Sequence, residues 1–458
     1  MKPHNIAKTA ACVLLACLGG TRDARASGGV EQARFGSEDG HAAGATPFAL
    51  YYNPAALALG ARLEIGAHLT LAWHGASYDR TSTTVPDPAT APGANVGTAR
   101  VSDVLAAPAL ALSYRLSDFV IAAGAYVPFA GMQSWSGGGH SYPQYPGTSD
   151  GSARWHFLEG GTTSFYASLG ASYTIRPIRL SLGVSANLVH NSLEFTRALN
   201  AAGDDNIATE GRSYLDVGSF TGSFGLGVLW EAVEKKAWVG LSYQAPPGLY
   251  KDISMDGTAR ILLGAGVTPT ESDVTLKQTM PDIIRFALRV RPTERYELRL
   301  TGDFTRWSVN ERQCLVHRGG NCGLNPDGSL TEGSDVMLNQ PRNWQDTFGI
   351  RLGGSYFFSP MWEGFASIGY DSNAIPAGTL DASLVDGHDL TYTLGGRARI
   401  QDRFGVLLAV SYQHWLERDT TGLSRLDQYR PPSKLPSSDG VYNQQAVVMN
   451  LLLQYHLR

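Results

Sequence analysis

Hydrophobic and polar residues alternate with a period of two along most of this chain. The clearest run lies at the C-terminus, where every second position is apolar: Val447, Met449, Leu451, Leu453, Tyr455 and Leu457. The positions between them include Asn450, Gln454, His456 and Arg458, and the same alternation recurs in residues 297–304 and 390–400. This pattern predicts β-strands that each have one apolar and one largely polar face. A soluble sandwich and a membrane barrel both fit it, because the pattern does not say which face points inward.

The lengths of the connections separate these two folds. Short turns are predicted near 117–118, 176–177, 231–235, 292–294, 359–360 and 401–402. Long polar loops alternate with them, near 77–103, 136–160, 199–213, 263–273, 308–343, 375–388 and 419–441. Strict alternation of short turns and long loops is typical of outer-membrane barrels, whose chain ends both lie in the periplasm. The sequence therefore predicts an all-β, 14-stranded antiparallel transmembrane β-barrel over residues 62–458.

Composition agrees with a barrel whose strands expose apolar residues to lipid at every second position. The chain is 43% hydrophobic but only 17% charged, and no apolar run approaches the roughly 20 residues of a membrane-spanning helix. The formal net charge of −4 gives no reason to expect a nucleic-acid partner. We expect the nine tryptophans, which fall near predicted strand ends, to form girdles at the membrane surfaces.

The first 61 residues do not follow the strand pattern. A basic start with Lys2 and Lys8, a short apolar run and the triplet Ala24-Arg25-Ala26 predict a signal peptide over residues 1–26. Lipoprotein processing at Cys17 is the alternative. Residues 27–61 are rich in Gly and Ala, and their apolar stretch 48–59 favours a hatch, or plug, in the barrel lumen over a disordered tail.

The residues give little support for a metal, cofactor or catalytic site. Cys314 and Cys322 lie eight positions apart in an exported loop, where one local disulfide or two free thiols are both compatible with the spacing. No cluster of residues has the spacing of a metal site, and we expect no metal or cofactor. Residues 147–151 match G-x-S-x-G, but they lie in a polar loop rather than between a strand and a helix. We therefore expect a protein that is not an enzyme.

Several short segments together resemble the FadL-type family of outer-membrane transport proteins for long-chain fatty acids and aromatic hydrocarbons, which includes TodX-like members. The triplet Asn53-Pro54-Ala55 resembles the motif of the family's N-terminal hatch, and Gly124 to Gly131, with Pro128 and Phe129, resembles its Gly-x-x-x-Pro-Phe-Gly pattern in the third strand. Further similar segments follow in family order: 280–282, 303–308, 344–347, 369–371 with Pro376, and 392–395.

The resemblance implies passive transport of hydrophobic small molecules. In the family, the kink in the third strand is understood as a side exit through which the ligand enters the bilayer, and the matching position here is Pro128. Proline has no amide hydrogen, so it also interrupts a strand on physical grounds. We expect the amide of Asn53 to hydrogen-bond backbone groups exposed by that kink.

The sequence leaves the identity of the ligand open. Charged side chains that alternate with apolar ones should face the lumen, which places Arg285, Arg289, Arg299 and Arg351 there as candidate contacts for a ligand carboxylate, or as members of ion pairs with lumenal acids. The expected partners are a hydrophobic small molecule, outer-membrane lipid and the barrel assembly machinery, and we expect a monomer. A general diffusion porin and an adhesin-like barrel are the alternatives.

Overall fold

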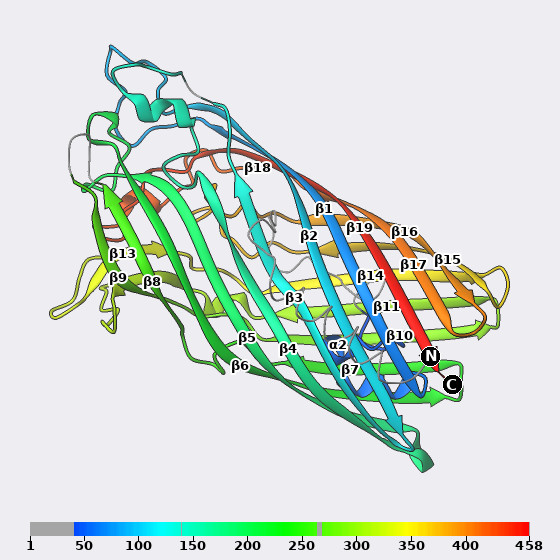
Figure 1. Ribbon diagram of the computed structural model, residues 1–458. Coiled ribbons are helices and arrows are strands. Elements are labelled where there is room, and N and C mark those ends of the chain that lie inside the picture. The colour runs from blue at the N-terminus through cyan, green and yellow to red at the C-terminus, as the bar shows by residue number, and fades with distance from the viewer. Residues whose placement is uncertain (1–40, 139, 263–267, 458) are drawn as a thin grey trace, which may run out of the picture.

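The computed structural model of the chain describes residues 41–138, 140–262 and 268–457. They form a closed antiparallel barrel whose wall has fourteen strands, as the alternation of turns and loops predicts (Figure 1). In order around the wall these are β1 (Leu63–Arg80), β2 (Gly97–Leu116), β3 (Phe119–Ser134), β4 (Glu159–Ile175), β5 (Leu180–Leu199), β6 (Gly211–Val233), β7 (Ala237–Gln244), β10 (Ile283–Thr293), β11 (Tyr296–Thr305), β14 (Thr347–Phe357), β15 (Trp362–Asp371), β16 (Asp389–Ile400), β17 (Phe404–Trp415) and β19 (Gly440–Leu457).

The last strand closes the barrel on the first. The pairing of β19 with β1 runs from Leu63 opposite Leu457 to Arg80 opposite Gly440, so it covers the full length of both strands. The expected signal peptide, and residues 27–40 of the expected hatch, lie outside the described residues. Among the described residues, no helix is both long and apolar enough to cross a membrane.

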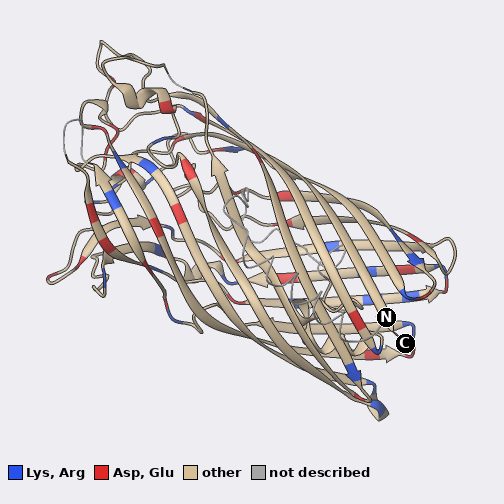
Figure 2. Ribbon diagram, viewed as in Figure 1, with Lys and Arg blue, Asp and Glu red and all other residues tan. Residues whose placement is uncertain are grey.

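Exposure of the side chains shows which face of the wall is apolar. Along β16, Tyr392 and Leu394 are exposed on the outside, whereas Thr391 and Thr393 between them are buried in the lumen. The other wall strands show the same arrangement, which is the reverse of that in a soluble protein: the outward positions are mostly Leu, Val, Ile and Phe. Along the strands nearest the viewer in Figure 2, charged residues gather towards the strand ends. An apolar outer belt with a polar interior is the arrangement that a bilayer requires.

Four further strands extend the sheet beyond the wall on one side. They are β8 (Ile253–Leu262), β9 (Thr270–Gln278), β12 (Arg312–His317) and β13 (Val336–Pro341). β6 is long enough to pair with β7 through its second half and with β8 through its first part, and β9, β12 and β13 follow outward. We call these four strands the outer sheet; Figure 1 shows it at the end of the barrel opposite the C-terminus.

The outer sheet corrects one detail of the predicted topology. A loop was expected near 263–273, but the connection between the wall strands β7 and β10 spans residues 245–282 and contains β8 and β9. Strand alternation does not stop at the membrane surface, so a strand outside the bilayer looks like one inside it. Residues 263–267 of the expected loop lie outside the described residues.

The expected tryptophan girdles are largely wrong. Six of the nine tryptophans are buried in the lumen or under the long loops: Trp135, Trp155, Trp238, Trp307, Trp344 and Trp415. Trp230 and Trp362 are exposed near the short turns, together with Phe119, Tyr173 and Tyr296. Position near a strand end does not tell whether an indole points to lipid or to the interior.

The remaining elements are short. They are the helix α2 (Ala49–Tyr52), the 3₁₀ turns η1 (Pro54–Leu59), η2 (Pro146–Asp150), η3 (Arg176–Ile178), η4 (Ile207–Thr209), η5 (Trp307–Val309) and η6 (Leu426–Gln428), and the two-residue strand β18 (Arg418–Asp419).

Candidate functional site

The described part of the hatch consists of α2 and η1, which lie inside the barrel. Every residue of α2 is buried, as are the first four residues of η1. Asn53 separates the two turns, and its side-chain oxygen accepts a hydrogen bond from the backbone N–H of Ala55 at 3.1 Å. Asparagine is a favoured N-cap, and Pro54 fits the first position of a turn because that position needs no donor. The Asn-Pro-Ala triplet therefore shapes the hatch locally.

The carboxamide nitrogen of Asn53 connects the hatch to the wall on β6. It donates to the carbonyl oxygen of Val228 at 3.0 Å and to that of Ala42 at 2.7 Å. The expected bond from Asn53 to the kink of β3 is therefore wrong, because both donors of the amide are used elsewhere. The hatch reaches β3 through ring contacts instead, with the centroids of Tyr51 and Tyr126 5.5 Å apart.

Glycines on neighbouring strands make room for this docking. A Cβ atom on Gly183 of β5 would lie 2.2 Å from the backbone nitrogen of Ala55, and one on Gly227 of β6 would lie 2.0 Å from Oδ1 of Asn53. A Cβ atom on Gly170 of β4 would lie 2.4 Å from Cδ1 of Leu50, and one on Gly240 of β7 would lie 2.6 Å from the carbonyl oxygen of Ala42. Only glycine permits such an approach of two backbones. We call these four residues the glycine patch.

The third strand is irregular at the position that the sequence singles out. In the pairing of β3 with β4, Tyr126 lies opposite Tyr166 and Phe129 lies opposite Ser164, so Val127 and Pro128 together face one residue. One extra residue in one strand is a β-bulge, which bends the strand. Pro128 favours it because proline cannot donate a ladder hydrogen bond.

The pairing of β3 with β2 ends at the bulge. Its last pair is Leu110 with Ala125, next to Gly124. Further out, the strands meet again where Arg100 and Ser136 exchange backbone hydrogen bonds of 2.8 Å. Residues 101–109 of β2 and 126–134 of β3 are therefore not paired with one another, and we call this the unpaired stretch. β2 carries Pro108 there, a second proline whose position within an alternating run was a signal that the sequence prediction missed.

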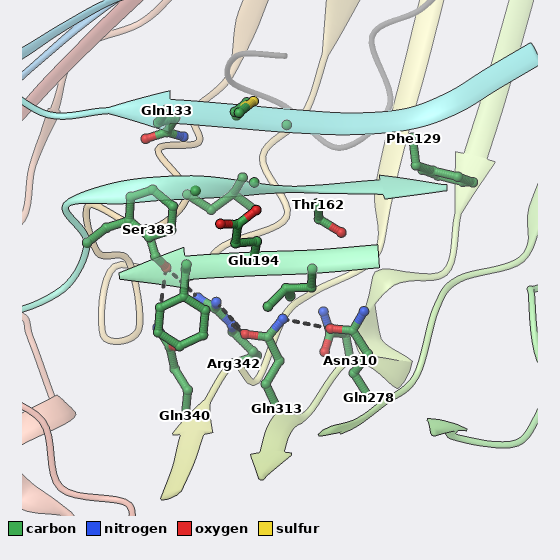
Figure 3. A pocket seen from close by; sticks show the side chains of 18 of the residues that line it. Phe129, Gln133, Thr162, Glu194, Gln278, Asn310, Gln313, Gln340, Arg342 and Ser383 are labelled. Atoms are coloured by element: carbon green, nitrogen blue, oxygen red, sulfur yellow. Dashed lines mark hydrogen bonds between the residues drawn. The ribbon is translucent and has the colours of Figure 1, made fainter. Parts of the chain in front are cut away.

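A pocket lies on the lumenal side of the unpaired stretch (Figure 3). It is bounded by β3, β4 and β5 on one side and by residues of the outer sheet and the long connections on the other. Its empty volume is about 800 Å³, including the open mouth, which is within the usual range of small-molecule sites. Nine of its lining residues are apolar: Phe129, Met132, Phe157, Leu193, Phe195, Met280, Trp307, Trp344 and Leu384. Gly131, where an added Cβ would meet nothing within 4 Å, also lines it.

The opposite side of the pocket is polar, and its groups are mostly satisfied by one another. The Gln313 amide donates to Gln278 at 2.6 Å and accepts from the Arg342 guanidinium at 2.6 and 3.1 Å. Arg342 also donates to the Ser383 hydroxyl, and it lies 3.7 Å from the buried carboxylate of Asp381. Burial lowers the pKa of Arg342, and the Asp381 carboxylate partly opposes that change.

A buried histidine lies at the edge of this pocket. His156 belongs to the connection between β3 and β4, and one of its ring nitrogens lies 3.3 Å from the carbonyl oxygen of Ser437. Burial lowers the pKa of His156 to about 4, because the apolar surroundings disfavour the charged ring. The side chain is therefore neutral at physiological pH.

The four arginines predicted from the alternation lie near the hatch and deeper in the lumen. Arg289 and Arg299 lie 2.8 and 3.5 Å from the Glu297 carboxylate, Arg351 bridges Asp303 and Asp371, and Arg285 lies over the rings of Tyr51 and Tyr52. The environments of Arg289, Arg299 and Arg351 fit the ion-pair alternative that the sequence left open, whereas Arg285 is described by its ring contacts. None of the four lines the pocket described above.

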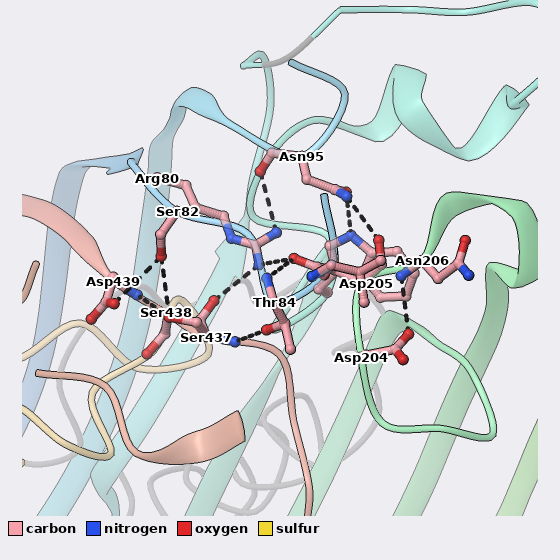
Figure 4. Close-up of polar contacts among 12 residues, drawn as sticks. Arg80, Ser82, Thr84, Asn95, Asp204, Asp205, Asn206, Ser437, Ser438 and Asp439 are labelled. Atoms are coloured by element: carbon pink, nitrogen blue, oxygen red, sulfur yellow. Dashed lines mark hydrogen bonds and ion pairs between the residues drawn. The ribbon is translucent and has the colours of Figure 1, made fainter. Parts of the chain in front are cut away.

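The long loops above the pocket are joined by a buried ion pair (Figure 4). The guanidinium of Arg80 lies 2.6 Å from the carboxylate of Asp205, and it also donates to the carbonyl oxygens of Asn95 and Ser437. Asp205 accepts backbone hydrogen bonds from Thr84 and Val85. Three long loops, 81–96, 200–210 and 416–439, thus meet at one charge pair. In the outer sheet, Cys314 and Cys322 form a disulfide.

A sequence model of the family described as "Outer membrane protein transport protein (OMPP1/FadL/TodX)" matches residues 30–455. The chain belongs to this family. It is accordingly an outer-membrane barrel that transports hydrophobic compounds, and the family is one of transporters rather than enzymes. No curated protein matches the sequence closely enough to be counted as a relative.

Solved structures of FadL and TodX proteins have the same fold. A FadL homologue from Pseudomonas aeruginosa superimposes with a TM-score of 0.74 at 15% identity, over 95% of this chain and 98% of that one. The toluene transporter TodX of P. putida has a TM-score of 0.62 at 17% identity, over 90% and 94% of the two chains. The toluene transporter TbuX of Ralstonia pickettii has a TM-score of 0.57 at 17% identity, again over 90% and 94%.

Proposed function

We propose that the chain binds apolar small molecules in the pocket and releases them sideways into the bilayer through the unpaired stretch between β2 and β3. In this arrangement the long loops face outward and both chain ends lie in the periplasm, as is usual for bacterial barrels. The transport is passive, because the ligand moves from water to a phase in which its free energy is lower.

One observation carries the proposal: the pocket and the unpaired stretch share the same segment of β3. Phe129, Gly131, Met132 and Gln133 line the pocket, and all of them belong to the part of β3 that is not paired with β2. A ligand in the pocket is thus one strand away from lipid. Transfer of an alkyl chain from water to hydrocarbon releases about 0.8 kcal/mol per methylene, so a sideways exit runs downhill.

The hatch supports transport of selected molecules over free diffusion. α2 and η1 pack against the glycine patch across the inside of the wall, and a general diffusion porin has no need for such a segment. Fatty acids and aromatic hydrocarbons are both candidate ligands, because FadL and toluene transporters share the fold. Outer-membrane lipid receives the ligand in either case.

Deletion of Pro128 tests the sideways exit. The deletion leaves Val127 alone opposite Phe165, which restores one-for-one pairing between β3 and β4. It also removes the residue that has no backbone N–H to donate. We expect uptake of radiolabelled toluene and of a long-chain fatty acid by whole cells to fall to the level of cells without the protein. The variant should still assemble, as judged by its heat-dependent migration in electrophoresis.

Pro128→Ala is the matched control, because it restores the donor but keeps the extra residue and hence the bulge. We expect it to retain most of the uptake. Normal uptake by the deletion variant at normal expression would rule out the sideways exit. Large, steady ion currents through the purified protein in a planar bilayer would instead favour a diffusion porin.

A further inference from the structure

Three buried polar groups of residues that line the pocket have no hydrogen-bond partner among the described residues: the side-chain oxygen of Asn310, the indole N–H of Trp344 and the Nδ1 atom of His156. His156 lies at the edge of the pocket, whereas Asn310 and Trp344 are hydrogen-bonded to each other through their backbones. Asn310 is 3% exposed and Trp344 is 7% exposed, and both line the pocket. An unpaired buried polar group is destabilising, so two of them in one cavity point to a ligand that satisfies both.

The two groups belong to one cluster. The backbone N–H of Trp344 donates to the carbonyl oxygen of Asn310 at 3.3 Å, and that of Asn310 donates to Trp307 at 2.8 Å. The rings of Trp307 and Trp344 lie 4.8 Å apart. Figure 3 shows Asn310 beside Gln278 and Gln313, where the apolar side of the pocket meets the polar side.

The chemistry of these groups selects the kind of ligand head. One is an acceptor and the other is a donor, so a hydroxyl group can satisfy both, because it donates and accepts at once. A carboxylate only accepts, and it would leave the Asn310 oxygen without a partner. A plain hydrocarbon would leave both groups without one.

The charges around the pocket also favour a ligand whose polar end is neutral. The donors of Arg342 face Gln313 and Ser383, and its charge lies beside the Asp381 carboxylate. A second anion near Asp381 would be repelled by it. Another buried guanidinium, that of Arg197, interacts with the same carboxylate but does not line the pocket.

We infer that the pocket binds apolar molecules that carry one neutral hydroxyl group, such as long-chain alcohols or phenols, and that Asn310 and Trp344 hold this hydroxyl. The inference rests on the proposed function and names the ligand class for it. The nine apolar side chains take the hydrocarbon body, and the Asn310–Trp344 pair fixes its polar end.

The test compares three probes of one chain length on the full protein in lipid nanodiscs: 1-decanol, n-decane, and decanoate at a pH where it is ionised. Binding is followed by tryptophan fluorescence, with displacement of an apolar dye as a second readout. Trp344→Phe removes the N–H and keeps an aromatic ring, and Asn310→Leu removes the acceptor and keeps the branched shape of the side chain. We expect each variant to bind decanol about fivefold to tenfold more weakly, with little change for decane.

Trp362→Phe is the control, since this tryptophan is exposed at a short turn and outside the pocket. Equal losses for decanol and decane, or tighter binding of decanoate than of decanol by the unchanged protein, would overturn the hydroxyl assignment alone. Absence of binding by all three probes would overturn the proposed function as well. Heat-dependent electrophoretic migration shows that each variant is folded.

Discussion

The carboxamide nitrogen of Asn53 lies 3.0 Å from the carbonyl oxygen of Val228, which joins the hatch to the second half of β6. The residue next to Val228 is Gly227, and it has no side chain to hold the hatch away. The hydrogen bond and the glycine are therefore two parts of one contact. Loss of either should move the hatch from the wall.

Gly227→Ala should loosen the hatch. The added methyl would lie 2.0 Å from Oδ1 of Asn53, a distance that no side-chain contact tolerates. We expect larger and more frequent ion currents through the variant in planar bilayers, because the lumen is less well closed. Gly405→Ala is the control: its Cβ also faces the lumen but meets other atoms only at 3.4 Å or more. Equal currents from the two variants would contradict a close-packed hatch.

Arg80→Ala should loosen the long loops. The change leaves the fully buried Asp205 carboxylate without its counter-charge, and breaking a buried ion pair costs about 3 to 5 kcal/mol. Hydrogen exchange should become faster in residues 81–96 and 200–210, whereas the wall strands should keep their protection. Arg260→Ala removes an ion pair whose two side chains are 62% and 55% exposed, so we expect no measurable change there. Similar exchange in both variants would show that the buried pair does not hold the loops.

Reduction of the disulfide should act on the outer sheet alone. A short loop between Cys314 and Cys322 corresponds to about 2 to 3 kcal/mol of chain entropy. Cys314→Ser with Cys322→Ser should therefore speed proteolysis between β12 and β13. The fraction of folded barrel in electrophoresis should stay constant, and a loss of barrel assembly would show that the outer sheet is needed for folding of the wall.

His156 should make the folded protein less stable in acid. Its pKa is about 4 in the folded protein and 6.5 when the ring is exposed, so the unfolded state takes up a proton first as the pH falls. The contribution of the neutral ring is complete above pH 6.5 and is lost progressively towards pH 4. We expect a smaller fall in Tm over this range for His156→Gln than for the unchanged protein. His140→Gln, an exposed histidine of the same connection, should behave like the unchanged protein.

The strand count follows from local features, which is why the sequence predicts it well. Side chains such as Thr393 and Leu394 alternate because the period of a strand is two, and the lengths of the connections tell outside from inside. The side of the wall to which an aromatic side chain points does not follow from local features. Trp135 and Trp230 both lie near strand ends, yet only Trp230 is exposed, because packing under the long loops decides the orientation of the indole.

The candidate site is visible in the sequence only where one residue carries a local signal. Pro128 is such a case, since a proline inside an alternating run cannot take part in a regular ladder. Asn53 is recognisable by its motif, but its partner Val228 is 175 positions away and offers a carbonyl oxygen that any residue has. Asn310 and Trp344 lie in a long connection without periodicity, and only the folded chain brings them into one cavity.

The outer sheet is joined to the wall through one long strand, β6, which runs from the short-turn end of the barrel to beyond the wall. Three polar residues of the pocket, Gln278, Gln313 and Gln340, thus lie on strands outside the wall, whereas its apolar residues Phe129 and Leu193 lie on wall strands. Exchange of β8, β9, β12 and β13 between homologous proteins should therefore alter which pollutant or nutrient a cell admits without disturbing membrane insertion. This makes the outer sheet the natural place to engineer a whole-cell biosensor.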